Sequence, residues 1–315
     1  MPTNNSPGDA KDLSGGRLGA TQGLAAYLMW GCFPLYFKAV ASVPALEVLA
    51  HRIIWSALFL LLFVFATGKG TELGNILRDG RTIAILGCTT LLISINWLTF
   101  IKAVADGRVL ESSLGYYINP LVSVLLGFVF LRERLSTLQK VSIGLAAAGV
   151  ILQTAMVGRV PLVSLTLAFS FGLYGLVRKA AKVPAVTGLT VEMMITIPLA
   201  AVYLAILMDR GKAVFMSGNL GMNFLLGIAG IVTATPLILY GAALHRLKLS
   251  TMGIMQYIVP TGHFLWAVLA FGETFTLAHL VSFAFIWAAL ILYTWDTFFT
   301  SRSATQGMGQ LDGLR

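Results

Sequence analysis

The chain is poor in charged residues. Only 11% of its 315 residues are charged, whereas 57% are hydrophobic, and the mean hydropathy is +0.84. Both values lie outside the range of soluble globular domains, so the composition excludes a water-soluble fold. The sequence predicts an all-α integral membrane protein whose surroundings are a lipid bilayer.

Cysteine is equally scarce. Cys32 and Cys88 are the two cysteines, and both lie in apolar stretches without CxxC or Cys/His spacing. This pattern argues against a disulfide framework and against a zinc site. The sequence also has no covalent-cofactor motif, so we expect neither a metal nor a cofactor.

Motifs of nucleotide-driven and hydrolytic proteins are missing. The sequence contains no GxxxxGK[ST], no HExxH and no GxSxG, which argues against an ATP-driven pump and against a membrane-embedded enzyme. The net charge of +9 comes from basic residues dispersed over short connections. Because they form no stripe on one surface, we do not expect nucleic acid as a partner.

Long apolar runs, by contrast, are abundant. A helix needs about 20 apolar residues to cross the hydrocarbon, and polar residues divide this sequence into ten such runs. The termini, 1–18 and 299–315, are rich in small and polar residues, which predicts a disordered and a mobile cytoplasmic tail. The predicted helices cover 19–40, 46–66, 82–104, 110–131, 138–157, 161–181, 188–208, 222–244, 250–271 and 276–298.

Lysine and arginine predict the orientation of these helices, since basic residues resist translocation. With the N-terminus inside, fifteen of the 22 basic residues fall on the cytoplasmic side and six on the other. Arg52 falls within a helix. The distribution predicts a multi-pass membrane protein with both termini in the cytoplasm.

The sequence repeats itself at an offset of about 140 residues. "YINP" at 117–120 matches "YIVP" at 257–260, and "VPA" at 43–45 matches "VPA" at 183–185. Ordered matches at one offset indicate duplication. Because a five-helix unit is odd, the second copy enters the membrane upside down, and such inverted repeats are typical of alternating-access transporters.

Two prolines occupy equivalent positions in this repeat, Pro120 and Pro260. A proline removes one backbone hydrogen bond and splays a helix, which a membrane tolerates only against protein or a water-filled cavity. The predicted helices 110–131 and 250–271 are therefore either bent walls of a central cavity or helices kinked only for packing.

Three stretches resemble the RarD branch of the EamA-type transporters, within the drug/metabolite transporter superfamily. They are "NWLTFIKAVADGRVLESSLGYYINPLVSVLLG", "PLYFKAVASVPALEVLAHRIIWS" and "QYIVP". The resemblance covers 19–298 and implies two EamA-like repeats, 19–157 and 161–298, in an inner-membrane protein linked to chloramphenicol sensitivity and the export of drugs or metabolites. Lys102 and Asp106 stand where the branch is expected to carry an aromatic residue and an asparagine.

Polar and aromatic side chains on six predicted helices are candidates for a substrate cavity. Tyrosine and tryptophan offer flat apolar faces with one donor each. A side-chain amide in hydrocarbon must find a partner, water or substrate. The candidates are Trp30, Asn96, Trp97, Tyr116, Tyr117, Asn119, Tyr174, Tyr240, Gln256 and Tyr257.

Ionisable groups at membrane depth are candidates for gating or coupling, because each costs about 3 kcal/mol to insert. Glu47, His51 and Arg52 fall at i, i+4 and i+5 of one helix. They form either an interfacial salt-bridge cluster or an anion or proton site. Lys102 either snorkels to the interface or turns inward, where it would attract a carboxylate.

Two further ionisable groups belong to the second repeat. The offset places Glu192 opposite Arg52, which suggests a gating pair; pairing with Lys179 or Arg178 is the alternative. His263 lies one turn after its proline and is either a hydrogen-bonded core histidine or a proton-coupling group.

Together these features predict a secondary active transporter of small amphipathic or aromatic metabolites or drugs that works by alternating access, and the resemblance implies that it exports them. A passive channel or facilitator is the alternative, and a membrane-embedded enzyme ranks third. A small-xxx-small face, Gly144 and Ala148, is suited to a contact in a homodimer.

Overall fold

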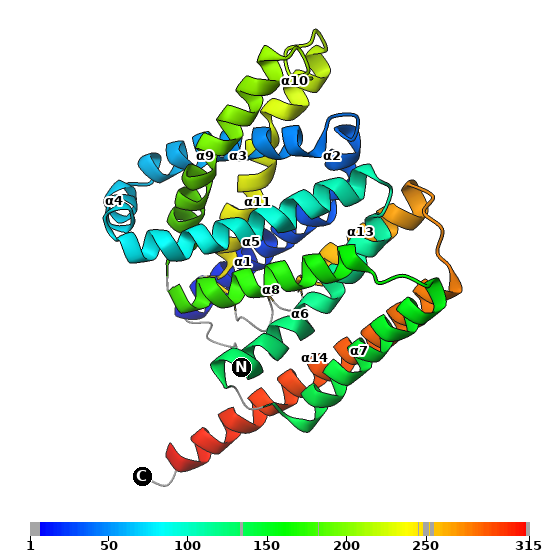
Figure 1. Ribbon diagram of the computed structural model, residues 1–315. Helices are drawn as coiled ribbons and strands as arrows, with labels where there is room; N and C mark the ends of the chain where they lie inside the picture. The colour runs from blue at the N-terminus through cyan, green and yellow to red at the C-terminus, as the bar shows by residue number, and fades with distance from the viewer. Residues whose placement is uncertain are drawn as a thin grey trace.

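The computed structural model describes residues 7–132, 135–181, 183–244, 246–247, 252 and 255–312. Within these ranges the regular structure is entirely helical (Figure 1). The elements are α1 (Pro7–Gly31), α2 (Phe33–Ala39), α3 (Ala45–Ala66), α4 (Gly70–Arg78), α5 (Gly80–Ala105), α6 (Val109–Leu131), α7 (Thr137–Val157), α8 (Leu162–Ala181), α9 (Ala185–Asp209), α10 (Leu220–Gly227), α11 (Ala229–Leu244), α13 (Ile258–Leu265), the π-helix η1 (Trp266–Ala270) and α14 (Leu277–Asp312).

Among the described residues, six helices and the α10–α11 pair taken as one span are long and apolar enough to cross a membrane, and two shorter apolar helices accompany these seven spans. The protein is therefore a multi-pass membrane protein. Each of the ten apolar runs predicted from the sequence overlaps a helix or a pair of helices. The runs 19–40 and 222–244 are each divided, at Cys32 and Ile228 respectively.

Two helices extend into the ranges predicted to be a disordered tail (1–18) and a mobile tail (299–315). α1 begins at Pro7, and α14 continues to Asp312. Proline is favoured in the first turn of a helix, and no proline follows Pro7 until Pro34. The short helix α4 was also not expected. It forms because Leu73 and Ile76 lie three residues apart and bury one face.

Helix starts follow local chemistry. Pro44 and Pro184, which the repeat aligns, are the N-caps of α3 and α9, with φ and ψ of −52° and 132° and of −55° and 144°. Ser136 opens α7 with a capping box that includes Gln139. Gly158 ends α7 at φ 75°, a left-handed conformation that costs glycine no Cβ clash.

Helices from the two halves of the chain pack against each other in a reciprocal pattern. α1 packs on α11 and α13, and α8 packs on α5 and α6. α11 contacts α3, and α5 contacts α9. Three further contacts, α3 with α9, α6 with α13 and α7 with α14, join helices at equivalent positions of the two halves. α7 and α14 lie side by side at one edge of the bundle (Figure 1).

Two of these crossings depend on glycine. A Cβ on Gly262 would lie 2.9 Å from the carbonyl oxygen of Gly31, so α13 touches the backbone of α1. A Cβ on Gly172 of α8 would lie 3.0 Å from the side chain of Val122 in α6. The repeat offset relates these two crossings, since Val122 aligns with Gly262 and Gly31 lies one residue from the position aligned with Gly172.

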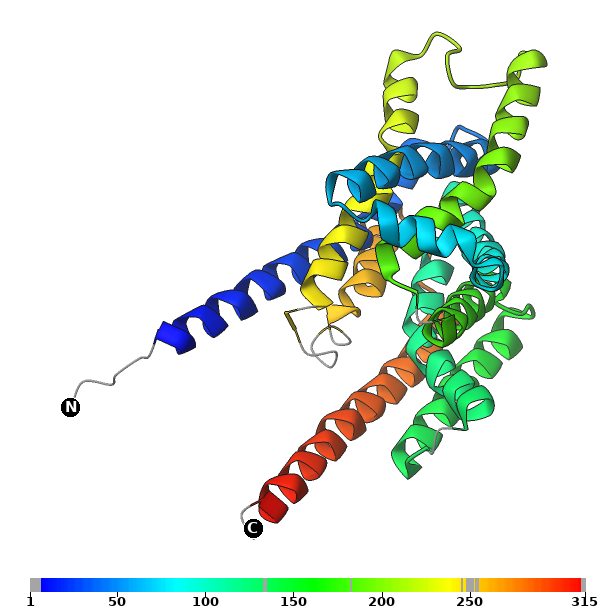
Figure 2. The same ribbon diagram turned by 90° about the vertical axis from the view of Figure 1, so that its left-hand side faces the viewer.

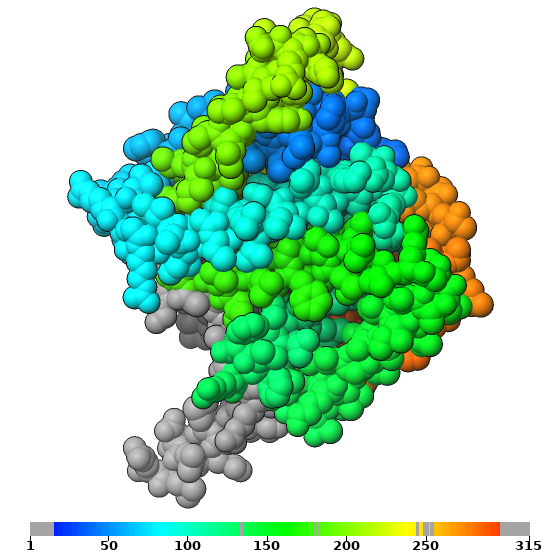
Figure 3. Space-filling view, viewed as in Figure 1, coloured from blue at the N-terminus to red at the C-terminus, as the bar shows by residue number. Residues whose placement is uncertain are grey.

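The described ends of α1 and α14 lie at the same end of the bundle (Figures 1 and 2). We call this end the proximal side, and the opposite end, which carries the α2–α3, α5–α6, α7–α8, α9–α10 and η1–α14 connections, the distal side. α5 and α8 cover the face shown in Figure 3, and α9 and α10 project above it. Large apolar side chains on the helices are exposed, among them Phe65 and Leu199 at 66% and 75%, as expected for lipid contact.

Candidate functional site

Arg52 of α3 is buried between the two halves of the chain. The side chain is 3% exposed. Its Nε donates to Thr233 Oγ1 of α11 at 2.9 Å, and its guanidinium carbon lies 3.8 Å from the ring centroid of Trp97. Phe37 and Phe33 of α2 lie at 5.4 and 5.7 Å. Arg52 is thus surrounded by aromatic rings rather than by carboxylates.

Glu47 and His51 share a helix with Arg52, but the three side chains do not form the salt-bridge cluster considered above. Glu47 Oε1 accepts the backbone N–H groups of Val214 and Phe215 at 2.7 and 3.1 Å. The His51 ring packs on the Phe215 ring at 4.5 Å. Among the described residues no ion pair includes any of the three. Glu47 instead fastens the α9–α10 connection to α3.

His263 of α13 is connected to Arg52 through a series of aromatic rings, Phe37 and Phe100. Its ring stacks on Phe100 at 5.1 Å and meets Tyr116 edge-on at 5.4 Å. Nε2 lies 3.0 Å from the carbonyl oxygen of Trp30, whereas Nδ1 is buried without a hydrogen-bond partner. The structure therefore places His263 in the bundle core, with one ring nitrogen free.

The predicted cavity asparagines bind helix backbone. Asn96 Nδ2 donates to the Leu167 carbonyl and to Ser170 Oγ, both at 3.0 Å. Asn119 Nδ2 donates to the Ala168 carbonyl, also at 3.0 Å. Since these acceptors all belong to α8, the two amides find protein partners and tie α5 and α6 to α8. The Tyr116 hydroxyl reaches Asn96 Oδ1 at 3.4 Å.

The proline-bearing helices meet near Tyr117. Its hydroxyl lies 2.7 Å from Thr261 Oγ1, and Ser113 Oγ of α6 donates to the Pro260 carbonyl of α13 at 2.8 Å. Pro120 lies inside α6, which continues past it to Leu131. The two helices are therefore joined by side-chain hydrogen bonds close to their prolines.

Glu192 of α9 is fully buried and has three partners. Thr89 Oγ1 and the Tyr174 hydroxyl donate to its carboxylate at 2.7 and 3.2 Å, and Arg178 Nη1 lies 3.6 Å away. Of the two pairings that the sequence left open, the structure thus forms the one with α8, and Arg52 is not its partner. Lys179 is part of α8, but its side chain lies outside the described residues.

In the part of the chain that the structure describes, the remaining candidates form no ion pair, hydrogen bond or ring contact with Arg52. Lys102 is 67% exposed and pairs with Asp106 at 3.1 Å, so it does not turn inward. Trp30 and Tyr240 pack at 5.6 Å between α1 and α11. Gln256 and Tyr257 are half-buried next to the start of α13.

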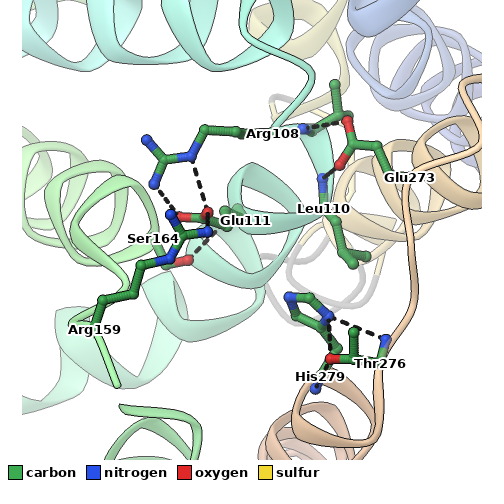
Figure 4. A network of polar contacts seen from close by, with 9 residues as sticks. Arg108, Leu110, Glu111, Arg159, Ser164, Glu273, Thr276 and His279 are labelled. Carbon is green, nitrogen blue, oxygen red and sulfur yellow. Dashed lines mark hydrogen bonds and ion pairs between the residues drawn. The ribbon is translucent and has the colours of Figure 1, made fainter. Parts of the chain in front are cut away.

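A polar network on the distal side was not anticipated as a functional site (Figure 4). Arg108 makes two hydrogen bonds to the carboxylate of Glu111, at 2.9 and 2.7 Å, and Arg159 lies 3.7 Å from that carboxylate. Glu273 accepts the backbone N–H groups of Val109 and Leu110 at 2.7 and 2.8 Å. The network joins the start of α6 to two other connections.

Only the repeat drew attention to Glu273 in the sequence, as the counterpart of Glu133, which lies outside the described residues. A stronger signal was available, because the charged residues of the network fall in three connections on one predicted side. Glu273 lies between η1 and α14, and burial raises the pKa of its carboxyl. Glu273 and Glu47 make the same kind of contact in opposite directions. Each carboxylate accepts two backbone N–H groups of the other half of the chain.

Comparison with known proteins relates the whole chain to transporters. Residues 17–155 match the EamA-like transporter family. Protein RarD of Escherichia coli K12 is 43% identical over 298 residues, covering 95% of this chain and 100% of that protein. An uncharacterized transporter of Vibrio cholerae is 44% identical over 285 residues, covering 90% and 94%.

A more distant relative is the chloramphenicol-sensitive protein RarD of Pseudomonas aeruginosa, 32% identical over 89% of this chain and 94% of that one. A crystal structure with 19% identity superimposes with a TM-score of 0.56, covering 88% of this chain and 95% of that chain. At this identity the likeness shows the fold alone. The sequence relatives show more, and the chain belongs to the RarD branch of the EamA-like transporters and is a membrane transporter.

Proposed function

We propose that the protein is a secondary active transporter of small metabolites or drugs that works by alternating access. Ten membrane-crossing helices form two inverted five-helix repeats, 19–157 and 161–298. Each repeat adopts one of two shapes, and exchange of the shapes moves a central site from one side of the membrane to the other.

The observation that carries this proposal is the reciprocal packing of the two halves. The contacts of α1 with α11 and α13 recur as contacts of α8 with α5 and α6. The N-cap prolines of α3 and α9 lie at aligned positions. Such a pattern is expected of a duplicated unit, and a duplicated odd-numbered unit is inverted in the membrane.

The distal carboxylates support a state that is closed on that side. Glu47 and Glu273 each hold backbone N–H groups of the opposite half. Release of both contacts would separate the distal connections. By the basic-residue distribution the distal side is periplasmic, so this state faces the cytoplasm, with both termini in the cytoplasm of a bacterial inner membrane.

Aromatic residues around Arg52 and His263 support amphipathic or aromatic solutes as the substrates, because flat rings bury flat apolar surface well. Export is the proposed direction. A homodimer through the Gly144 and Ala148 face is proposed as well, since a Cβ on Gly144 would meet no atom within 4 Å, which leaves that face open.

The proposal is tested with purified protein in lipid vesicles. Vesicles preloaded with unlabelled solute should take up labelled solute by exchange, with saturation at micromolar to millimolar concentrations. A channel or facilitator would instead give flux that stays proportional to concentration far above the millimolar range. Turnover of the solute without vesicles would favour an enzyme.

A further inference from the structure

We propose that Arg52 is the binding group for the anionic head of the substrate, and that the substrates are organic carboxylates with a flat apolar body. This assignment rests on the proposed transport function and names its substrate class. It starts from a charge in the core of the protein that no described carboxylate neutralises.

The guanidinium has donors left over. Arginine carries five N–H donors. Nε of Arg52 uses its donor on Thr233, while Nη1 is buried and without a hydrogen-bond partner. A buried cation is unfavourable unless it is paired, and no described acid lies within ion-pair distance of it. A carboxylate from the substrate would supply both the opposite charge and the acceptors.

The surroundings fit the apolar part of such a molecule. Trp97 faces the guanidinium at 3.8 Å, and Phe37 meets Phe100 at 5.5 Å. Phe100 in turn contacts Tyr116 and His263 at 5.9 and 5.1 Å. A continuous series of packed aromatic rings therefore runs from the charge toward α6 and α13, the proline-bearing helices of both repeats.

Arg52 differs from the other buried ionisable groups in this respect. Glu192 has Thr89, Tyr174 and Arg178 as partners, and Glu47 has two backbone donors. Those groups hold the protein together. Arg52 lies where α2, α3, α5 and α11 meet, so it contacts both halves of the chain.

The assignment also agrees with export. An anion bound to Arg52 gives a complex with no net charge at the site, which lowers the cost of passing the membrane interior. The negative interior of a bacterial cell then favours the return of the empty, positively charged site toward the inside, which favours net export of the anion.

The test uses the purified full-length protein and three probes of one shape: indole-3-acetate, the neutral indole-3-acetamide and the cation tryptamine. Binding is measured by calorimetry and by the rise in melting temperature. Indole-3-acetate should bind the natural protein. The two analogues should bind it at least tenfold more weakly than indole-3-acetate does. Arg52→Gln should weaken indole-3-acetate by roughly tenfold to a hundredfold, because it removes a charged hydrogen-bond donor, and should leave the amide unchanged.

Arg52→Lys should recover part of the affinity, since it keeps the charge but loses the fork. The matched control is Arg210→Gln, which removes an exposed charge at the end of α9 and should not alter binding. The assignment is overturned if indole-3-acetate and indole-3-acetamide bind equally well, or if indole-3-acetate binds Arg52→Gln as tightly as it binds the natural protein. Failure of indole-3-acetate to bind also overturns it.

The vesicle exchange assay separates this proposal from the transport proposal. If a neutral or cationic probe exchanges saturably and Arg52→Gln does not affect it, the transporter stands and the anion site falls. If indole-3-acetate binds through Arg52 but never crosses, the anion site stands and alternating access falls.

Discussion

Glu273 offers the sharpest test of distal closure, through its replacement by alanine. The carboxylate accepts two N–H groups of the first turn of α6, at 2.7 and 2.8 Å. A hydrogen bond to a charged group contributes about 1.5–3 kcal/mol, but water can replace part of it at a half-buried site. Loss of a helix cap costs about 1–2 kcal/mol, and Glu273→Ala should destabilise the closed arrangement by about that amount.

This energy corresponds to a roughly 5- to 30-fold larger open population. The assay labels a reporter, Ser113→Cys, with a membrane-impermeant maleimide in right-side-out vesicles, after Cys32 and Cys88 have been replaced by serine. Ser113 is 0% exposed and lies one turn beyond Leu110. The labelling rate should rise roughly 5- to 30-fold in Glu273→Ala, in proportion to the open population.

Glu72→Ala is the matched control. Glu72 accepts a hydrogen bond from Thr187 at 2.5 Å, between α4 and α9, on the proximal side. Its loss removes a carboxylate contact between the halves from the other end, so distal labelling should not increase. An unchanged labelling rate in Glu273→Ala, or an equal rise in both variants, would refute the closing role of Glu273.

Three further predictions follow from the same structure. Burial raises the pKa of Glu273, and Lys38 and Glu111 are its charged neighbours. Because the pKa is raised in the closed arrangement, protonation of Glu273 favours that arrangement. Labelling of Ser113→Cys should therefore fall as the pH falls through the raised pKa, and Glu273→Gln should abolish this pH dependence. If His51, Glu192 or His263 carries protons, its replacement by glutamine should abolish gradient-driven uptake and preserve exchange; loss of both would exclude a coupling role. A Cβ on Gly230 would lie 2.3 Å from the backbone of Trp55, whereas a Cβ on Gly241, the control position, would meet nothing within 4 Å. Gly230→Ala should therefore cost about 1–3 kcal/mol of stability and lower the melting temperature. An unchanged melting temperature would contradict this contact.

The sequence predicts the helices well because hydrocarbon length and apolar composition are local properties. The repeat also aligns Pro44 with Pro184, and these two prolines start equivalent helices. The helix α4 was missed because its apolar face is only Leu73 and Ile76, too short a pattern to separate from a loop.

Partners of individual side chains were harder to predict. Glu192 had three candidate partners, Arg52, Lys179 and Arg178, and only the folded structure shows that Arg178 lies 3.6 Å from its carboxylate. Asn96 and Asn119 each donate to a backbone carbonyl of α8, and backbone acceptors carry no signature in the sequence. The network of Figure 4 required three connections to meet in space, and no local pattern contains that information.

The cross-half contacts of Glu47 and Glu273 have a consequence for how the protein can change. Both carboxylates hold main-chain N–H groups, those of residues 214 and 215 and of residues 109 and 110. Every amino acid except proline supplies such a group. The receiving connections are therefore free to vary in side chain while closure is kept, provided that the two glutamates stay and no proline enters opposite them.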